Sequence, residues 1–179
     1  MRPRHLPERR AGAPSVTRGA RFERKVVPPD VAGALESALA RLVRPLVFTN
    51  GVFDILHRGH ATYLAQARAL GASLVVALNA DASVRRLGKG DDRPINRLED
   101  RLAVVAALES VSLVTWFEED TPAALIERCL PDVLVKGGDW PVERIVGADL
   151  VRAHGGSVHS IPFEHERSTT ALLTRIRGA

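Results

Sequence analysis

Two histidines, His57 and His60, flank Gly59 at the point where an apolar run gives way to a helical pattern. Residues 45–49 predict a buried strand, and residues 59–70 repeat apolar side chains at helical spacing. The histidines therefore fall at a helix N-terminus, where unpaired N–H groups and the helix dipole favour an anion. A glycine there lets the backbone approach a ligand without a Cβ in the way. The pattern predicts a site that holds phosphate groups.

Short apolar runs alternate with helical patterns from about residue 31 onwards. Runs that are apolar throughout are typical of strands covered on both faces, as in a parallel sheet. We therefore expect an α/β, Rossmann-like fold of three layers, with a parallel five-stranded sheet and helices on both faces. The expected strands are residues 45–49, 73–78, 112–116, 132–135 and 157–161. The expected helices are residues 31–42, 59–70, 97–109, 121–129 and 141–153.

Other residues suited to binding follow the expected strands directly. Asn79 follows the second strand, residues 137–139 follow the fourth, and residues 168–170 follow the fifth. Ligands of open parallel sheets bind beyond the carboxyl ends of the strands, where the strand order reverses. We expect these residues to gather with the two histidines at one edge of the sheet.

Length and composition fit one folded domain. With 179 residues and 45% hydrophobic content, the chain can bury a single core. Cys129 is the only cysteine, which excludes a disulfide framework and a thiolate metal site. No apolar stretch is long enough to span a bilayer, and the arginine-rich start lacks the apolar segment of a secretory signal. We expect a cytoplasmic protein with no membrane partner.

The positive charge is concentrated near the N-terminus. The net charge is +4, and residues 1–30 hold eight basic and three acidic residues. Prolines and weak apolar periodicity there predict a basic, disordered tail over residues 1–30, followed by one domain over residues 31–179. Such a tail can contact nucleic acid, but we expect a solubilising segment and no nucleic-acid partner.

Two motifs together resemble a known family. The His-x-Gly-His pattern at residues 57–60 and the Ser-Thr-Thr pattern at residues 168–170 are similar to the signature of nucleotidyltransferases of the cytidylyltransferase-like superfamily. The likeness covers roughly residues 45–177. Within the superfamily, the heptose 1-phosphate adenylyltransferases in their stand-alone form are the best match, through residues 49–57, 89–94, 117–122 and 134–139.

The resemblance implies transfer of AMP from ATP to D-glycero-β-D-manno-heptose 1-phosphate, giving ADP-heptose for lipopolysaccharide synthesis and pyrophosphate. The attacking phosphate oxygen is already ionised near neutral pH, so the protein must position and neutralise two polyanions and needs no general base. Mg²⁺ is expected, bound mainly through ATP and not by a metal site of the protein. The resemblance also admits a homo-oligomer.

The family's motif positions imply roles for individual residues, because imidazoles, an ammonium group, hydroxyls and backbone N–H groups stabilise phosphate charge. The expected catalytic residues are His57, His60 and Lys89. The expected nucleotide-binding residues are Thr49, Asn50, Gly51, Phe53, Gly59, Gly137, Gly138, Asp139, Ser168, Thr169 and Thr170. The expected substrate-binding residues are Asp54, Asn79 and Arg93.

Several alternatives stay open. A cytidylyltransferase acting on glycerol 3-phosphate shares both motifs and differs in its base and acceptor. A non-catalytic nucleic-acid-binding module would use the basic tail. Asp54 has a second reading, since an aspartate before a helix also caps it. The chain departs from the superfamily pattern at residues 163–167, where the arginine expected early in the stretch is absent and Arg167 lies in a different register.

Overall fold

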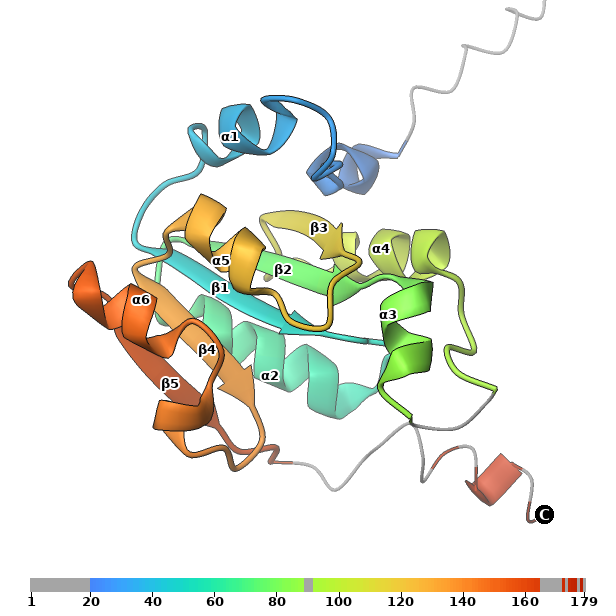
Figure 1. Ribbon diagram of the computed structural model, residues 1–179. Helices are drawn as coiled ribbons and strands as arrows, with labels where there is room; N and C mark the ends of the chain where they lie inside the picture. Colours follow the sequence, from blue (N-terminus) through green and yellow to red (C-terminus); the bar gives the residue numbers. More distant parts are fainter. Residues whose placement is uncertain (1–19, 89–91, 165–171, 173, 177, 179) are drawn as a thin grey trace, which may run out of the picture.

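A parallel sheet of five strands runs through the computed structural model, which describes residues 20–88, 92–164, 172, 174–176 and 178 (Figure 1). The strands are β1 (Leu46–Gly51), β2 (Ser73–Asn79), β3 (Leu113–Phe117), β4 (Val133–Gly137) and β5 (Ser157–Ile161). Each begins and ends within about two residues of its predicted range. The predicted fold class is confirmed.

The strand order is β3-β2-β1-β4-β5, and every neighbouring pair is parallel. The chain winds outwards from β1 to β2 and β3, and then returns to the other side of β1 for β4 and β5. The winding therefore reverses between β1 and β4. In an open α/β sheet, this reversal leaves a crevice at the carboxyl ends of the two strands.

Helices cover both faces of the sheet, which gives three layers (Figure 1). On one face pack α1 (Ala34–Leu39), α5 (Ala123–Cys129) and α6 (Ala148–Ala153). On the other pack α2 (Arg58–Arg68) and α4 (Leu98–Ala106). The shorter elements are α3 (Asp81–Arg86) and the 3-10 helices η1 (Arg21–Lys25) and η2 (Val142–Arg144). Within the described residues, no helix combines the length and apolar character that crossing a bilayer requires.

Side chains of the central strand point alternately to the two faces. Leu46 and Phe48 of β1 join the core cluster under α1, α5 and α6, whereas Val47 joins the cluster under α2 and α4. All three are buried, so an apolar residue suits every position of the strand. This two-sided burial explains why the strand sequence shows no alternation of polar and apolar residues.

The prediction of one helix over residues 141–153 is wrong, because Gly147 separates η2 from α6. Gly147 adopts a φ of +87°, in the left-handed region that favours glycine. A Cβ there would approach the Ile126 side chain to 2.8 Å, so the glycine also permits close packing against α5. The helix predicted over residues 31–42 is likewise shorter, spanning only α1.

Residues 20–30 pack against the domain, so the predicted tail boundary at residue 30 lies too far along the chain. Val26 forms a parallel bridge with Val114 of β3, and the Val27 N–H donates to the Val114 carbonyl at 2.8 Å. The rest of the predicted tail, residues 1–19, lies outside the described residues.

A fully buried arginine ties together the loops at the carboxyl edge of the sheet. Arg101 of α4 donates from Nη1 to the Val52 carbonyl at 2.8 Å and from Nε to the Asn96 carbonyl at 3.1 Å. Its Nη2 lies 2.7 Å from Asp81 Oδ1 at the start of α3. A buried guanidinium needs such partners because it stays charged. Arg101 thus fixes the segments after β1 and β2 relative to each other.

Replacing Arg101 by methionine should lower the free energy of unfolding by about 3 kcal/mol, because two carbonyls and the Asp81 carboxylate lose their donor. Urea denaturation followed by circular dichroism measures the change. Arg97→Met, at an exposed position one turn earlier, is the matched control and should change stability by less than about 0.5 kcal/mol. Equal losses in the two variants would contradict the assigned role of Arg101.

Candidate active site

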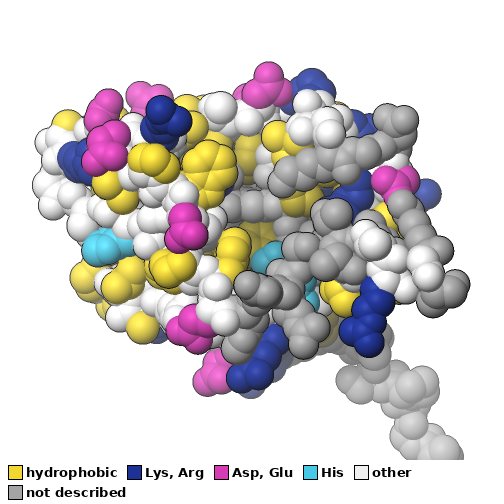
Figure 2. Space-filling model, turned by 90° about the horizontal axis from the view of Figure 1, so that it is seen from below, with side chains coloured by type: hydrophobic (Ala, Val, Ile, Leu, Met, Phe, Trp, Pro, Cys, Tyr) yellow, Lys and Arg dark blue, Asp and Glu magenta, His cyan; other side chains and the backbone are white. Residues whose placement is uncertain are grey.

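The candidate site lies where β1 and β4 end beside each other. Thr49 of β1 pairs with Val135 of β4, and α2 begins directly after its N-cap residue His57. The first motif, residues 137–139 and the start of α2 therefore meet at the reversal in strand order, the place expected from their positions in the sequence. Figure 2, which looks at the molecule from below, shows histidine side chains near the middle of the surface.

His57 and His60 form a stacked pair at the start of α2. Their ring centroids are 3.9 Å apart and their planes meet at 18°. The Phe53 ring packs edge-on against His60 at 5.2 Å. Gly59 is buried in the first turn of the helix, between the two histidines in sequence. The two imidazole rings therefore lie together at the N-terminus of α2.

Burial sets the protonation of His60. Its pKa is lowered from 6.5 to about 4, chiefly by desolvation and also by the neighbouring His57, while a hydrogen bond with the Ile55 backbone acts in the opposite direction. His60 is therefore neutral at pH 7, with one ring nitrogen as donor and the other as acceptor. It can offer an N–H group to an anion without first taking up a proton.

Phe53 occupies the space that Gly51 leaves open. A Cβ on Gly51 would lie 3.0 Å from the Phe53 ring, and Phe53 itself adopts a φ of +49°, which is rare for an aromatic residue. The Phe53 side chain is buried in the core cluster under α2. The Phe53 ring therefore supports His60 from the protein side. Nucleotide contacts of Gly51 and Phe53 stay a prediction.

The Thr49 side chain does not face the site. Its hydroxyl forms a hydrogen bond of 2.5 Å with the Tyr63 hydroxyl, and both side chains are buried between β1 and α2. Burial also raises the pKa of Tyr63, so its hydroxyl stays protonated. The Thr49 side chain is therefore engaged inside the core, and a nucleotide contact by this residue stays a prediction.

Asp54 and Arg93 form a buried ion pair. Arg93 Nε lies 2.9 Å from Asp54 Oδ2, as an ion pair without the alignment of a hydrogen bond, and both side chains are nearly inaccessible. The Asp54 carboxylate also accepts from the N–H groups of Ile95 and Asn96, each at 2.9 Å. The carboxylate therefore holds the segment before α4, and it does not cap α2, whose N-cap residue is His57. A substrate contact of Asp54 stays a prediction.

Gly137 and Gly138 give room to two aromatic rings. A Cβ on Gly137 would lie 2.8 Å from the Phe163 ring, and one on Gly138 would lie 3.3 Å from Trp140 Nε1. Gly138 adopts a φ of +104° and its N–H donates to the Ile161 carbonyl at 2.8 Å. The next residue along, Asp139, is exposed at the tip of this turn.

A cavity of about 400 Å³ opens beside the strand ends, on the side of α5 and η2. Lys136 Nζ donates to Asn50 Oδ1 at 3.3 Å across its floor, and Asn79 donates to Ser83 at 3.0 Å in its wall. Asn50 and Asn79 were predicted as site residues and both line it. Arg144, which also lines the cavity, lies outside every motif and carried no signal in the sequence.

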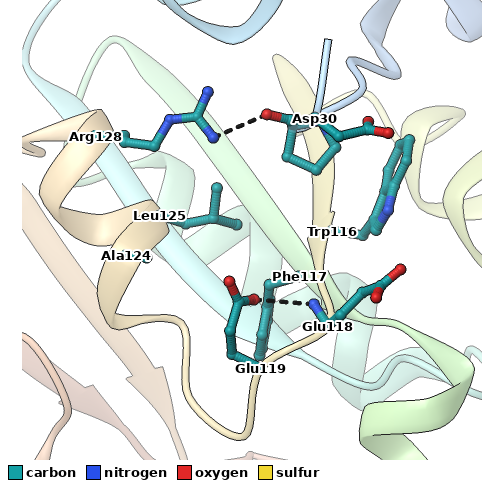
Figure 3. A pocket seen from close by; sticks show the side chains of 9 residues that line it. Asp30, Trp116, Phe117, Glu118, Glu119, Ala124, Leu125 and Arg128 are labelled. Carbon is teal, nitrogen blue, oxygen red and sulfur yellow. Dashed lines mark hydrogen bonds between the residues drawn. The ribbon is translucent and has the colours of Figure 1, made fainter. Parts of the chain in front are cut away.

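A second cavity, of about 440 Å³, lies beyond the end of β3 (Figure 3). Its arginine, Arg128, donates to the Pro29 carbonyl at 2.9 Å and to Glu36 at 2.8 Å. Glu119 accepts from the Glu118 N–H at 3.0 Å. These contacts hold the segment around α1 against α5. The polar side chains of this cavity are therefore already engaged in holding the fold together.

Four predicted site residues, Lys89, Ser168, Thr169 and Thr170, lie outside the described residues. In the part of the chain that the structure describes, no three histidine, cysteine, aspartate or glutamate side chains gather in a way that could hold a metal ion. The described site is therefore composed of imidazoles, a lysine, amides and backbone groups.

The depressed pKa of His60 should make stability depend on pH. Between pH 6.5 and about 4 the unfolded chain binds a proton that folded His60 refuses, so the free energy of unfolding should fall by about 1–3 kcal/mol as pH drops through this window. Denaturant titrations at several pH values measure the slope. His60→Asn should flatten it, whereas His154→Asn, at an exposed histidine, should not. Identical slopes in wild type and His60→Asn would contradict the assignment.

The Asp54–Arg93 pair should behave as a coupled unit. Asp54→Asn should lower the free energy of unfolding by about 3 kcal/mol, because it leaves the Arg93 guanidinium buried without a countercharge. Arg93→Met alone leaves the Asp54 carboxylate buried without its countercharge. The double variant should recover part of the lost free energy of unfolding. A double-mutant cycle by chemical denaturation measures the coupling, and strictly additive losses would show that the two side chains do not act together.

Residues 48–156 match the cytidylyltransferase-like family. The chain is 58% identical to D-beta-D-heptose 1-phosphate adenylyltransferase of Bordetella bronchiseptica, over 88% of this chain and 97% of that protein. It is 57% identical to the bifunctional protein HldE of Hahella chejuensis, over 74% of this chain but only 28% of that longer protein.

Solved structures show the same fold. A lipopolysaccharide core biosynthesis protein from Thermoplasma volcanium GSS1 is 30% identical and superposes with a TM-score of 0.55, covering 68% of this chain and 98% of that one. A pantoate-beta-alanine ligase from Francisella tularensis, 15% identical with a TM-score of 0.53, covers 81% of this chain and 69% of that one and shares the fold alone. As its two motifs predicted, the chain belongs to the cytidylyltransferase-like family of nucleotidyltransferases.

Proposed function

We propose that this chain transfers AMP from ATP to D-glycero-β-D-manno-heptose 1-phosphate, forming ADP-heptose for lipopolysaccharide synthesis and releasing pyrophosphate. The observation that carries the proposal is the stacked pair of His57 and His60 at the start of α2, beside the reversal in strand order. The acceptor follows from the 58% identity to a protein named for heptose 1-phosphate along nearly its whole length.

The reaction needs placement more than acid or base chemistry. An oxygen of the sugar phosphate attacks the α-phosphorus of ATP, a new P–O bond forms, and the bond to the bridging oxygen breaks so that pyrophosphate leaves with the electron pair. The attacking oxygen is already ionised, so no base removes a proton. His57, His60 and the N–H groups of α2 donate to phosphate oxygens as charge builds on the leaving group.

Three further assignments belong to the same proposal. Lys89 contributes positive charge near the α-phosphate, and residues 168–170 contribute hydroxyls to the outer phosphates. Asp139, exposed beside the end of β4, accepts from the ribose hydroxyls. Mg²⁺ would be bound mainly through the phosphate oxygens of ATP, where it would neutralise charge. ATP is a metabolite of the cytoplasm, so we expect the chain to act there. A homo-oligomer stays a prediction.

A pyrophosphate-release assay with ATP, MgCl₂ and heptose 1-phosphate tests the function. Wild-type protein should release pyrophosphate, and His57→Ala and His60→Ala should each lower kcat by about 100-fold, because each removes a preorganised donor. His154→Ala, at an exposed position away from the site, should keep the wild-type rate.

Substrate exchange separates this function from its competitor. CTP with glycerol 3-phosphate should give no pyrophosphate under the same conditions. Turnover with that pair and not with ATP and heptose 1-phosphate would assign a cytidylyltransferase instead. Unchanged turnover in both histidine variants would contradict the proposed role of the two imidazoles in the reaction.

A further inference from the structure

The two outer edges of the sheet differ in what covers them. On the β3 side, Val26 forms a parallel bridge with Val114, and the Val27 N–H donates to the Val114 carbonyl at 2.8 Å. On the β5 side, no described strand or bridge lies beyond Ser157–Ile161 (Figure 1). An uncovered edge carries backbone donors and acceptors that can pair with another strand. Within the described sheet, β5 is therefore the edge that is open to a partner.

The hydrogen bonds to β4 show which backbone groups of β5 face outwards. The Ser157 N–H and the Ile161 carbonyl both form hydrogen bonds on the β4 side of the strand. Because the backbone groups of successive residues point to opposite sides of a strand, His159 also faces β4. Val158 and Ser160 therefore turn their N–H and C=O groups to the open edge.

These outward groups are complementary to a second copy of themselves. Two β5 strands related by a two-fold axis at His159 run antiparallel, which is the arrangement of a symmetric dimer. Val158 of one copy then lies opposite Ser160 of the other, and each of the two equivalent pairs exchanges two N–H···O=C bonds. Every outward donor and acceptor of β5 is paired in this register.

The residues beside the strand disfavour the neighbouring registers. A two-fold axis at Val158 would require the Gly156 N–H, which already donates to the Val151 carbonyl at 2.9 Å. An axis at Ser160 would require an N–H from Pro162, and proline has none. The geometry of the edge therefore selects the register centred on His159.

The side chains around this edge also suit a second copy. β5 carries no lysine, arginine, carboxylate or proline, the residues that commonly protect an edge from pairing. Since α6 contacts both β4 and β5, the two copies of α6 would lie antiparallel and roughly 10 Å apart across the axis. Asp149 lies in the first turn of α6 and Arg152 in its last turn, and both are exposed. The acidic end of each helix would thus lie beside the basic end of the other.

We propose that two copies of this chain associate through β5, so that their two sheets become one continuous sheet. The outer edges of this assembly are the two β3 strands, each covered by Val26 and Val27, so association stops at two copies. The proposal is independent of the reaction, because no residue of the histidine motif belongs to β5 or α6.

His159→Cys tests the register directly. The two Cα atoms at position 159 would lie about 4.5 Å apart, within the range of a disulfide. Treatment with diamide should therefore give a disulfide-linked dimer on a non-reducing gel. Ser157→Cys, on the same face of β5, is the matched control: its two copies would lie roughly 14 Å apart and should not be linked. Cys129 is buried in both variants. Equal linkage in the two variants would contradict the register.

Charge at position 159 tests the dimer in solution. By size-exclusion chromatography with light scattering, wild type should have the mass of two chains, against 19.4 kDa for one. His159→Glu and His159→Lys should each weaken the dimer by about 100-fold, because like charges meet at the axis, whereas Ser157→Glu should stay dimeric. An equimolar mixture of the two position-159 variants should associate again, which excludes misfolding as the cause of dissociation. A monomeric wild type, or a dimer that His159→Glu leaves intact, overturns the proposal.

Discussion

The reversal of winding between β1 and β4 is the constraint on which the site depends. Parallel neighbours in a sheet must be joined by crossovers that return over one face. Because the chain leaves β1 towards α2 on one face and reaches β4 from α5 on the other, the carboxyl ends of these two strands stay uncovered between two layers. The histidine pair, the glycine turn after β4 and the cavity beside η2 all lie at this single opening.

Buried charges hold the opening in shape. Arg101 joins the segments after β1 and β2, and the Asp54–Arg93 pair joins the first motif to the segment before α4. Arg101 and Arg93 each lie against a carboxylate, and such a countercharge lowers the cost of keeping a charge in the core. The polar residues near the site therefore divide into those that face the opening and those that keep its walls in place.

The sequence was sufficient for the sheet and for the place of the site, but not for the direction of each side chain. Two-sided burial left continuous apolar strands, and the histidine motif marked the start of α2. Nothing in the local sequence shows that Asp54 meets Arg93, that Phe53 fills the space beside Gly51, or that Thr49 bonds Tyr63, because these contacts join distant segments. No sequence pattern indicates Arg144, because it is an isolated arginine in a short 3-10 helix.

The stacking of His57 on His60 limits the charge that the start of α2 can carry. Rings with centroids 3.9 Å apart repel each other strongly once both are cations, so the pair accommodates one added proton and resists a second. This repulsion keeps at least one of the two rings neutral, and a neutral ring still has an N–H group to donate. The imidazoles at the start of α2 therefore bring at most one positive charge to an approaching anion.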